Sequence, residues 1–482
     1  MKKSILIFII MLLLYCTPVL AADYIVTVNE GADITGYDLE PVFEEIGLYL
    51  TDEATAEQLY ERGIAKAITE DKPLVLPDTD DLLQVEDTGG SLAAMSADYN
   101  DTYYSEEIYF EQMGIKNYID TYNPSGQVRI AVIDTGVNRE HQDFANANIE
   151  TGYNFVTNST DTEDLYRHGT MVTSLIAAGA NDGVGVAGIA PNATIVPLVA
   201  MTKVNGEAAG TAAHLLLAIR AAVDTYDCKI ITTSLGVTAG YSEINMAVRY
   251  ATGKGVIVIS AAGNSGADSD STVASELSYP ASSPGAISVG ATDKYYNRAS
   301  YSQKNERVDV VAFGGTLTMP SNSGTAVYAK ANGTSFSAPV VAGMTALFVS
   351  NHPDITPKEY RAVLRGAAMD IGDLGSGDFM GCGMPDCMAM ERLYNDSNHI
   401  FIAPIYGDTD KNIKLMSDGT VNEAVLVSVY MKNGIVIKHR FDELIFDTDN
   451  LAYVSGEALD YTVRYFVIDS LDNMQSLSLV SE

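Results

Sequence analysis

Basic residues, cysteines and long apolar stretches are all scarce in this chain. Its 482 residues contain 29 Lys and Arg against 63 Asp and Glu, which gives a formal net charge of −34. A surface that negative repels phosphate backbones, which argues against a nucleic acid partner. The four cysteines and six histidines follow no zinc-binding spacing, so a zinc enzyme is disfavoured. Hydrophobic residues still make up 47% of the chain, which excludes wholesale disorder.

The first 21 residues have the pattern of a secretory signal peptide. Two lysines precede an apolar run at residues 4–14, and Val19 and Ala21 occupy the small-residue positions of a cleavage site. The run is short for a membrane span, and no later stretch reaches that length. An uncleaved anchor is the weaker alternative. A lipid on Cys16 is weaker still, because Tyr15 precedes it where lipid signals have a small residue. We expect a secreted protein without stable membrane insertion after cleavage.

Signal cleavage would leave three cysteines, an odd number. Cys382 and Cys387 are close enough in sequence to close a small loop as a disulfide. Cys228 begins an apolar strand and is expected to be a buried thiol.

Residues 22–97 form an acidic segment with signs of order. Between residues 23 and 98 there are 19 acidic residues and three basic ones. The pattern predicts a strand at 24–28, a helix at 54–67 and a short apolar run at 74–76. Gly89, Gly90 and Ser91 resemble a flexible junction. We expect a small α+β domain followed by a linker.

Residues 98–395 alternate short β-rich runs with helical stretches. This alternation predicts an α/β fold, a parallel sheet with helices on both faces. Thr356 and Pro357, with Glu359, form a clear helix start with a capping box. The predicted strands are 128–133, 194–199, 229–233, 256–260 and 286–289, and the predicted helices include 168–178, 212–223 and 243–251.

Residues 396–482 change to a β-rich pattern. Strands are predicted at 425–432, 435–440 and 461–468, with Asn433-Gly434 as a hairpin turn. A stabilising appendage is the favoured role of this C-terminal domain over a binding module.

Four short segments place chemically useful side chains where a strand or helix meets a turn. Asp134 ends an apolar strand, and Asn264 lies at a glycine turn after another strand. His168 opens a helix, and Ser335 lies at the positive end of a second helix, beside backbone amides. Taken singly, each has an ordinary structural explanation as a cap or turn residue.

Together the four segments supply a complete catalytic set. A serine needs a base to remove its proton, and that base must be a histidine oriented by a buried carboxylate. Ser335, His168 and Asp134 provide these groups, while Asn264 provides an amide for a developing oxyanion. The chain order Asp, His, Ser is that of subtilisin. Residues 104–388 therefore resemble a subtilase, a subtilisin-like serine protease.

The resemblance implies further binding residues. Ser234, Leu235 and Gly236 match the family strand that pairs with the substrate backbone, and Ala261, Ala262 and Gly263 match a wall of the main specificity pocket. The loop 183–191 resembles the family's calcium site, with Asp143 and Asp182 as side-chain ligands and the carbonyls of Val184 and Val186 beside them. No organic cofactor is implied.

Some residues depart from the family pattern. Met171 stands where many relatives have a second histidine, and Phe336 and Ser337 replace a more frequent Met and Ala. None of them is expected to touch a triad member.

The resemblance also gives the acidic segment a role. Subtilases are commonly made with a propeptide that guides folding, blocks the active site and is then removed. We expect a self-processing precursor with protein or peptide substrates, inhibited by its own propeptide, with the cut between about Gly90 and Tyr103.

Three alternatives differ in their chemistry. Asp-Thr-Gly is also an aspartic protease signature, but the second copy, at Asp87, has no apolar strand before it. A secreted binding protein that keeps an inactive subtilase fold would not need the complete triad. An esterase would use the same chemistry, although the segment at Ser234 favours an extended peptide.

Overall fold

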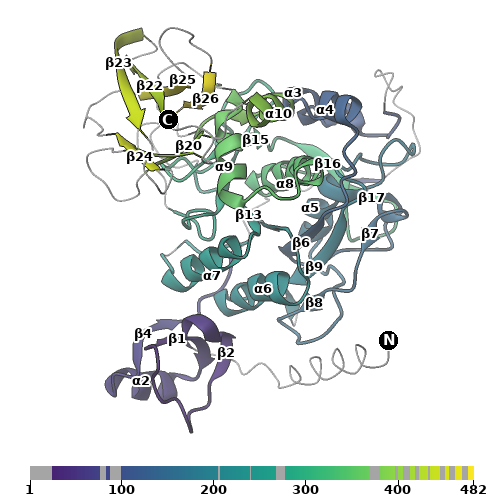
Figure 1. Cartoon of the computed structure of the whole chain (residues 1–482). Coiled ribbons are helices and arrows are strands. Elements are labelled where there is room, and N and C mark those ends of the chain that lie inside the picture. Colours follow the sequence, from purple (N-terminus) through teal and green to yellow (C-terminus); the bar gives the residue numbers. More distant parts are fainter. Residues whose placement is uncertain are drawn as a thin grey trace, which may run out of the picture.

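The computed structural model describes residues 24–75, 83–86, 99–204, 207–238, 240–266, 277–369, 371 and 380–396, and the backbone of seven strands between residues 400 and 481. Figure 1 shows a small N-terminal unit, a large central unit and a C-terminal group of strands. Residues 1–21, the junction from Gly89 to Ser91 and the Asn433-Gly434 pair lie outside the described residues.

The N-terminal unit is a four-stranded antiparallel sheet with one helix. Its strand order is β2-β3-β1-β4. The side chain of Asp52 caps the helix by accepting a hydrogen bond from the Thr55 N–H. The helix is shorter than the predicted 54–67, because Gly63 has a φ of +68° that ends it, and the chain continues as a strand. The elements are β1 (Tyr24–Val28), β2 (Glu40–Phe43), β3 (Leu48–Thr51), α2 (Glu53–Glu61) and β4 (Ala65–Glu70).

The central unit is built on a parallel sheet, as predicted. The strand order is β15-β14-β13-β12-β6-β9-β7, with β8 also paired to β9. Each predicted strand lies within one or two residues of an observed one, except that β14 continues beyond 289. The strands are β6 (Arg129–Asp134), β7 (Asn148–Ile149), β8 (Tyr153–Asn154), β9 (Thr194–Val199), β12 (Ile230–Thr233), β13 (Ile257–Ala261), β14 (Ile287–Thr292) and β15 (Val310–Phe313).

Helices cover both faces of this sheet because successive strand residues point to opposite sides. On β6, Ile130 and Val132 pack with residues of α5 and α8, whereas Ala131 and Ile133 pack with residues of α6 and α7. The sheet is therefore buried on both faces, which explains why its strands are nearly continuous apolar runs. The four helices are α5 (His168–Ala177), α6 (Ala212–Asp224), α7 (Ser242–Gly253) and α8 (Thr334–Asn351).

Smaller elements complete the central unit. The predicted capping box at Thr356 and Glu359 is present, and both of its hydrogen bonds form at the start of α9. An antiparallel sheet of order β16-β17-β5 joins Leu83–Glu86 to the edge of the unit. These elements are β5 (Leu83–Glu86), α3 (Tyr109–Gln112), α4 (Ile115–Tyr122), β10 (Thr202–Val204), β11 (Glu207–Ala209), β16 (Leu317–Pro320), β17 (Val327–Ala331), α9 (Pro357–Gly366), β18 (Ala368–Met369), β19 (Met384–Pro385) and α10 (Cys387–Asp396).

The C-terminal strands form two antiparallel sheets. Their orders are β20-β21-β24 and β23-β22-β25-β26. The three predicted strands here correspond to β22, β23 and β25. The bounds are β20 (Ile400–Pro404), β21 (Ile413–Ser417), β22 (Glu423–Lys432), β23 (Ile435–Ile445), β24 (Leu451–Val454), β25 (Thr462–Ile468) and β26 (Ser476–Ser481).

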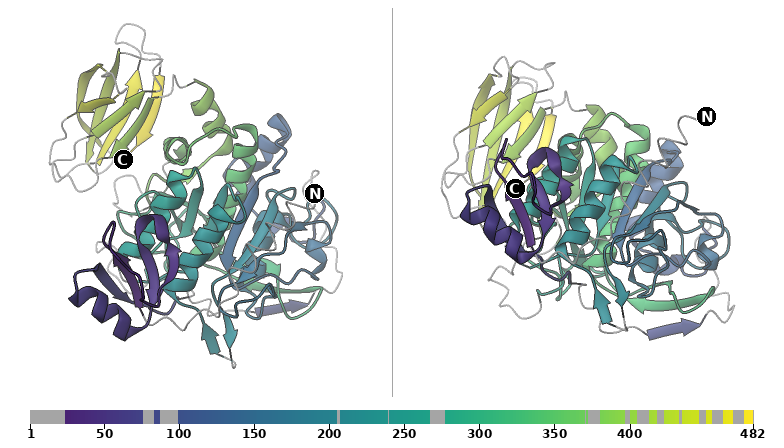
Figure 2. Two further views of the ribbon diagram at one scale, coloured as in Figure 1. Left: turned by 60° about the horizontal axis from the view of Figure 1, so that its bottom comes forward. Right: turned by 90° about the horizontal axis from the view of Figure 1, so that it is seen from below.

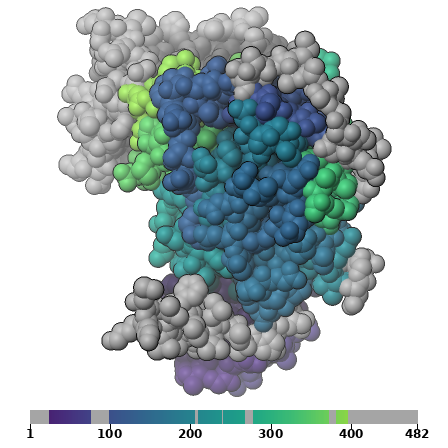
Figure 3. Space-filling view, turned by 90° about the vertical axis from the view of Figure 1, so that its right-hand side faces the viewer, coloured from purple at the N-terminus to yellow at the C-terminus, as the bar shows by residue number. Residues whose placement is uncertain are grey.

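The N-terminal unit packs against α6 and α7 of the central unit (Figure 2). The Phe43 ring lies 4.9 Å, centroid to centroid, from the Tyr250 ring, and the Thr69 hydroxyl donates to Glu243 at 2.7 Å. In the space-filling view of Figure 3 the unit lies at one end of the larger body. A mixed apolar and polar interface therefore joins the acidic N-terminal unit to two helices of the sheet.

Two further observations concern the apolar helices and the cysteines. Among the described residues, no helix is long and apolar enough to cross a membrane. Cys228, Cys382 and Cys387 are buried free thiols, so the disulfide considered for the last two is not formed here. Cys228 is the buried thiol that was expected, and burial raises its pKa to about 12.

Candidate active site

The four predicted catalytic residues come from four elements that meet at one edge of the parallel sheet. Asp134 is the last residue of β6, and Asn264 follows the end of β13. His168 is the first residue of α5, and Ser335 lies in the first turn of α8. Asp134, His168 and Ser335 are all buried. The carboxyl edge of a parallel sheet, where loops converge, thus holds the whole set.

Asp134 and His168 form a hydrogen-bonded pair. His168 Nδ1 donates to Asp134 Oδ1 at 2.7 Å, and the Thr135 N–H donates to the same oxygen at 2.8 Å. Burial lowers the pKa of His168, but the carboxylates of Asp134 and Asp164 raise it more, so the pKa lies above the usual 6.5. The pairing fixes the tautomer that leaves Nε2 able to accept a proton.

Gly169 allows this pair to form. A Cβ on Gly169 would lie 2.2 Å from the Gly136 carbonyl oxygen and 3.2 Å from Asp134 Cβ. Any side chain at residue 169 would therefore push α5 away from the end of β6.

Ser335, the candidate nucleophile, makes no hydrogen bond through its hydroxyl to any residue that the structure describes. Ser335 Oγ and His168 Nε2 are both buried and have no hydrogen-bond partner among the described residues. The next residue, Phe336, has its ring centroid 5.8 Å from that of His168, which brings the start of α8 beside the imidazole. The expectation that this family departure touches no triad member is therefore wrong. Catalytic hydrogen bonds of this kind often tighten only when substrate binds.

Two amide donors lie close to Gly333. An ideal Cβ on Gly333 would be 3.0 Å from Asn264 Nδ2 and 3.7 Å from the Ser335 backbone N. Asn264 Oδ1 is anchored by the N–H and hydroxyl of Thr334, at 2.9 and 2.8 Å, while Nδ2 is buried without a partner among the described residues. With no side chain at residue 333, the space in front of both donors stays open for a small anionic oxygen.

The predicted substrate strand is already paired with a segment of this chain. The Val75 N–H donates to the Gly236 carbonyl at 2.8 Å, and the Gly236 N–H donates back at 3.2 Å. One residue earlier, the Leu74 N–H donates to the Gly210 carbonyl at 2.9 Å, and the Leu74 side chain is buried. Ser234 links this segment to the candidate catalytic serine, because its hydroxyl donates to the Ser335 carbonyl at 3.0 Å. Residues 72–75 therefore lie between the segments at Thr211 and Gly236 and pair with each of them through an isolated antiparallel bridge.

A narrow pocket of about 40 Å³ opens beside this strand. Ser234, Leu235, Gly236, Ala261, Gly263 and Asn264 line it together with Val75, whereas the predicted Ala262 does not. Several lining residues were not assigned to the pocket from the sequence, and two of them, Ser278 and Gln303, come within 2.7 and 2.8 Å of where a Gly263 Cβ would be. Neither was given a role in the pocket, because only the folded chain brings them next to Gly263.

The predicted calcium residues lie around the loop after α5. Asp143 accepts hydrogen bonds from the Val186 N–H and from the Tyr328 hydroxyl, and Asp182 accepts from the Val184 N–H. Burial raises the pKa of Asp143 to about 7, and the negative charge of Asp182 contributes. Within the described part of the chain, no three acidic, histidine or cysteine side chains converge on a metal position. The oxygen donors suit calcium, but backbone carbonyls would have to complete the site.

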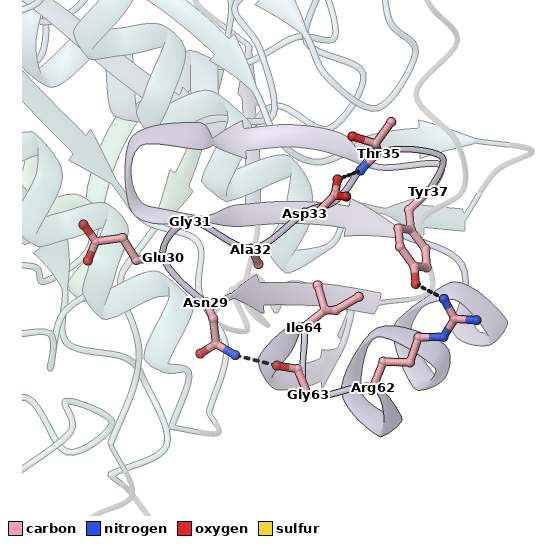
Figure 4. Close-up of a pocket in the computed structure, with 10 residues that line it drawn as sticks. All are labelled: Asn29, Glu30, Gly31, Ala32, Asp33, Thr35, Tyr37, Arg62, Gly63 and Ile64. Atoms are coloured by element: carbon pink, nitrogen blue, oxygen red, sulfur yellow. Dashed lines mark hydrogen bonds between the residues drawn. The ribbon is translucent and has the colours of Figure 1, made fainter.

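A wider crevice lies elsewhere, on the N-terminal unit (Figure 4). It has a volume of about 550 Å³ and is formed by the loop 29–37 and the turn 62–64. Its side chains are tied within the unit, since Arg62 donates to the Tyr37 hydroxyl and Asn29 to the Gly63 carbonyl, both at 2.8 Å. It contains none of the predicted site residues.

Comparison with known proteins decides the family. A model of the subtilase family matches residues 125–383, more than half of the chain. The chain belongs to the subtilase family.

Individual subtilases differ in how much of their length is matched. The chain is 39% identical to a "Thermophilic serine proteinase" of Bacillus sp. (strain AK1) over 254 residues, which cover 52% of this chain and 59% of that protein. It is 36% identical to "Subtilisin Savinase" of Lederbergia lenta over 265 residues, which cover 55% of this chain and 91% of the relative. A solved structure of a protease from Pseudoalteromonas arctica superposes with a TM-score of 0.52 and 27% identity, covering 61% of this chain and 98% of that one.

Proposed function

We propose that this subtilase is a secreted serine endopeptidase made as a self-processing precursor. The observation that carries the proposal is the 2.7 Å pair of His168 and Asp134 together with a buried Ser335 hydroxyl that has no partner among the described residues. In this mechanism Ser335 Oγ attacks the scissile carbonyl while His168 Nε2 takes its proton, and Asp134 stabilises the imidazolium. As the C–N bond breaks, His168 gives that proton to the leaving amine and the acyl-enzyme forms. Water then attacks the acyl-enzyme with His168 again acting as the base, and His168 returns the proton to Ser335 Oγ as the acid product leaves.

The oxyanion is held by two donors. Asn264 Nδ2 and the Ser335 backbone N both lie close to the space left open by Gly333, where we place the carbonyl oxygen that gains negative charge. Because both donors are fixed before substrate arrives, they stabilise the tetrahedral intermediate without reorganisation.

Peptide substrates pair with the strand at Gly236. Val75 supports this part of the proposal, because it makes both antiparallel hydrogen bonds to Gly236 within the chain itself. Backbone pairing of this kind accepts extended peptides of many sequences, which favours an endopeptidase over an esterase.

The N-terminal unit acts as an inhibitory propeptide. It packs on α6 and α7, and the segment that follows it fills the groove as far as Val75. The Asp71 carboxylate also accepts from the Ala213 N–H at the start of α6, at 2.9 Å. While this segment is in place, another peptide cannot pair with Gly236. The predicted cut between Gly90 and Tyr103 remains a prediction.

A structural calcium ion is the third part of the proposal. Asp143 and Asp182 would hold it with the carbonyls of Val184 and Val186, and the ion would offset the negative charge gathered at this loop. It takes no part in the reaction steps.

A fluorophosphonate probe tests the nucleophile directly. The purified chain should be labelled at Ser335 and should hydrolyse a peptide p-nitroanilide, while Ser335→Ala should do neither. No labelling of a folded chain freed from residues 24–75 would instead favour an inactive subtilase-fold binding protein.

A further inference from the structure

A buried carboxylate that the catalytic scheme does not use lies four residues before His168. Asp164 is 2% exposed, and its two oxygens accept five hydrogen bonds. Oδ1 accepts from the Thr135 hydroxyl at 2.9 Å and from the N–H groups of Tyr166 and Arg167 at 2.8 Å each. Oδ2 accepts from the N–H and hydroxyl of Thr170, at 2.9 and 2.6 Å.

These hydrogen bonds reach the residues next to both members of the acid–base pair. Thr135 directly follows Asp134, and its hydroxyl oxygen also accepts from the Gly169 N–H at 2.8 Å. Gly169 directly follows His168. One hydroxyl thus ties the end of β6 to the first turn of α5, and Asp164 fixes the direction in which that hydroxyl donates.

Asp164 also holds the turn that leads into His168. Arg167 has a φ of +85°, a conformation that is strained for a residue with a side chain. The N–H groups of Tyr166 and Arg167 both donate to Asp164. All five partners of Asp164 are hydrogen-bond donors, so the side chain at this position must accept through both of its terminal atoms. A carboxylate does so.

We propose that Asp164 is a positioning residue that sets the geometry of the Asp134–His168 pair. It touches neither the substrate nor the reacting atoms and acts through Thr135 and the first turn of α5. The expected change in kcat rests on the proposed hydrolytic function. The expected change in the pKa of His168 does not depend on activity.

The pKa of His168 distinguishes a role of the Asp164 charge from simple structural support, which would leave that pKa unchanged. The titratable groups acting on His168 are Asp134, from the end of β6, and Asp164, from the loop before α5. Both raise the pKa of His168 against the lowering effect of burial. Removing the charge of Asp164 while keeping its shape should therefore lower the pKa of His168.

Asp164→Asn is the first variant, with Asp161→Asn as the matched control. Asp161 is an exposed acid of the same loop that accepts from the Glu163 N–H. For Asp164→Asn we expect kcat to fall on the order of tenfold to hundredfold and KM to stay within about twofold of wild type. The acid limb of its pH–rate profile should lie at lower pH than in wild type. Asp161→Asn should behave as wild type. A kcat within about threefold of wild type and an unmoved acid limb would overturn the proposal.

A pair of variants at Thr135 tests the proposal even if Asp164→Asn fails to fold. Thr135→Ser keeps the hydroxyl between Asp164 and Gly169, whereas Thr135→Val removes it at nearly equal volume. We expect Thr135→Ser to retain most of the wild-type kcat and the kcat of Thr135→Val to fall about tenfold. Equal activity of the two variants would contradict the role assigned to the hydroxyl.

The pKa of His168 separates this proposal from the proposed function. It can be measured by NMR titration of labelled histidines in Ser335→Ala, with and without Asp164→Asn, in a protein that need not turn over. A lower pKa in the double variant supports the positioning role even if wild type proves inactive. An unchanged pKa refutes it even if wild type hydrolyses peptides.

Discussion

Replacing Asn264 with alanine tests how the oxyanion is held, because the structure anchors one side of this amide and leaves the other unpartnered. Oδ1 accepts two hydrogen bonds from Thr334, at 2.9 and 2.8 Å. Nδ2 is buried, has no partner in the described part of the chain, and lies 3.0 Å from the position of a Cβ on Gly333. The variant removes a donor whose orientation is already fixed.

The expected loss follows from one missing donor in a water-excluded site. Such a donor contributes about 2.7–4 kcal/mol to the transition state, so kcat should fall by roughly 10²–10³. KM should change little, because the hydrogen bond strengthens only as the carbonyl oxygen becomes negative. Alanine also leaves both Thr334 donors without their acceptor, which should cost about 1–3 kcal/mol of folding stability and lower the Tm.

The assay measures the hydrolysis of a peptide p-nitroanilide. Titration with the fluorophosphonate gives the concentration of active sites, from which kcat is calculated. Thr334→Ser is the control, because it keeps both the N–H and the hydroxyl that hold Asn264. Its kcat should stay within about threefold of wild type. A kcat loss below about fivefold in Asn264→Ala, or a loss confined to KM, would refute this role of the amide.

Four further predictions follow from the geometry. Asp134→Asn should lower kcat by about 10⁴ by giving His168 the wrong tautomer, and an active variant would contradict the triad. Because His168 works as a base only when neutral, and its pKa is raised, kcat/KM should rise with pH through a midpoint above 6.5; a midpoint below that value would contradict the pairing. Phe43→Ala should destabilise the inactive precursor by about 3–5 kcal/mol in denaturant unfolding, since the ring is fully buried, and no change would argue against the packing on α7. Chelating calcium should lower the Tm of wild type but not of Asp143→Asn, and equal shifts would place the ion elsewhere.

The parallel sheet could be predicted because its strands are buried on both faces. The bounds predicted for the strand 194–199 and the helix 168–178 agree with those of β9 and α5 to within one residue. An apolar run or a helical period that is bounded by turn residues restricts where an element can begin and end. The predicted helix at 54–67 was too long, because the pattern continues past Gly63 although the backbone there turns left-handed. The catalytic candidates could be named because each lies at the end of an element.

What the sequence did not reveal depends on tertiary contacts. Asp164 resembles any loop acid until the fold places five donors around it. The pairing of Val75 with Gly236 joins residues from different units, and Tyr328 reaches Asp143 across 185 positions of the chain. No local pattern encodes such distant partners.

The intact mass of the purified chain, wild type beside Ser335→Ala, tests the central claim most directly. If Ser335 is the nucleophile of a self-processing protease, wild type should lack an N-terminal segment that ends before Tyr103, whose N–H is bonded to Gly185 in the central unit. Ser335→Ala should keep the N-terminal unit that begins at Tyr24. Equal masses for the two proteins would contradict self-processing by Ser335.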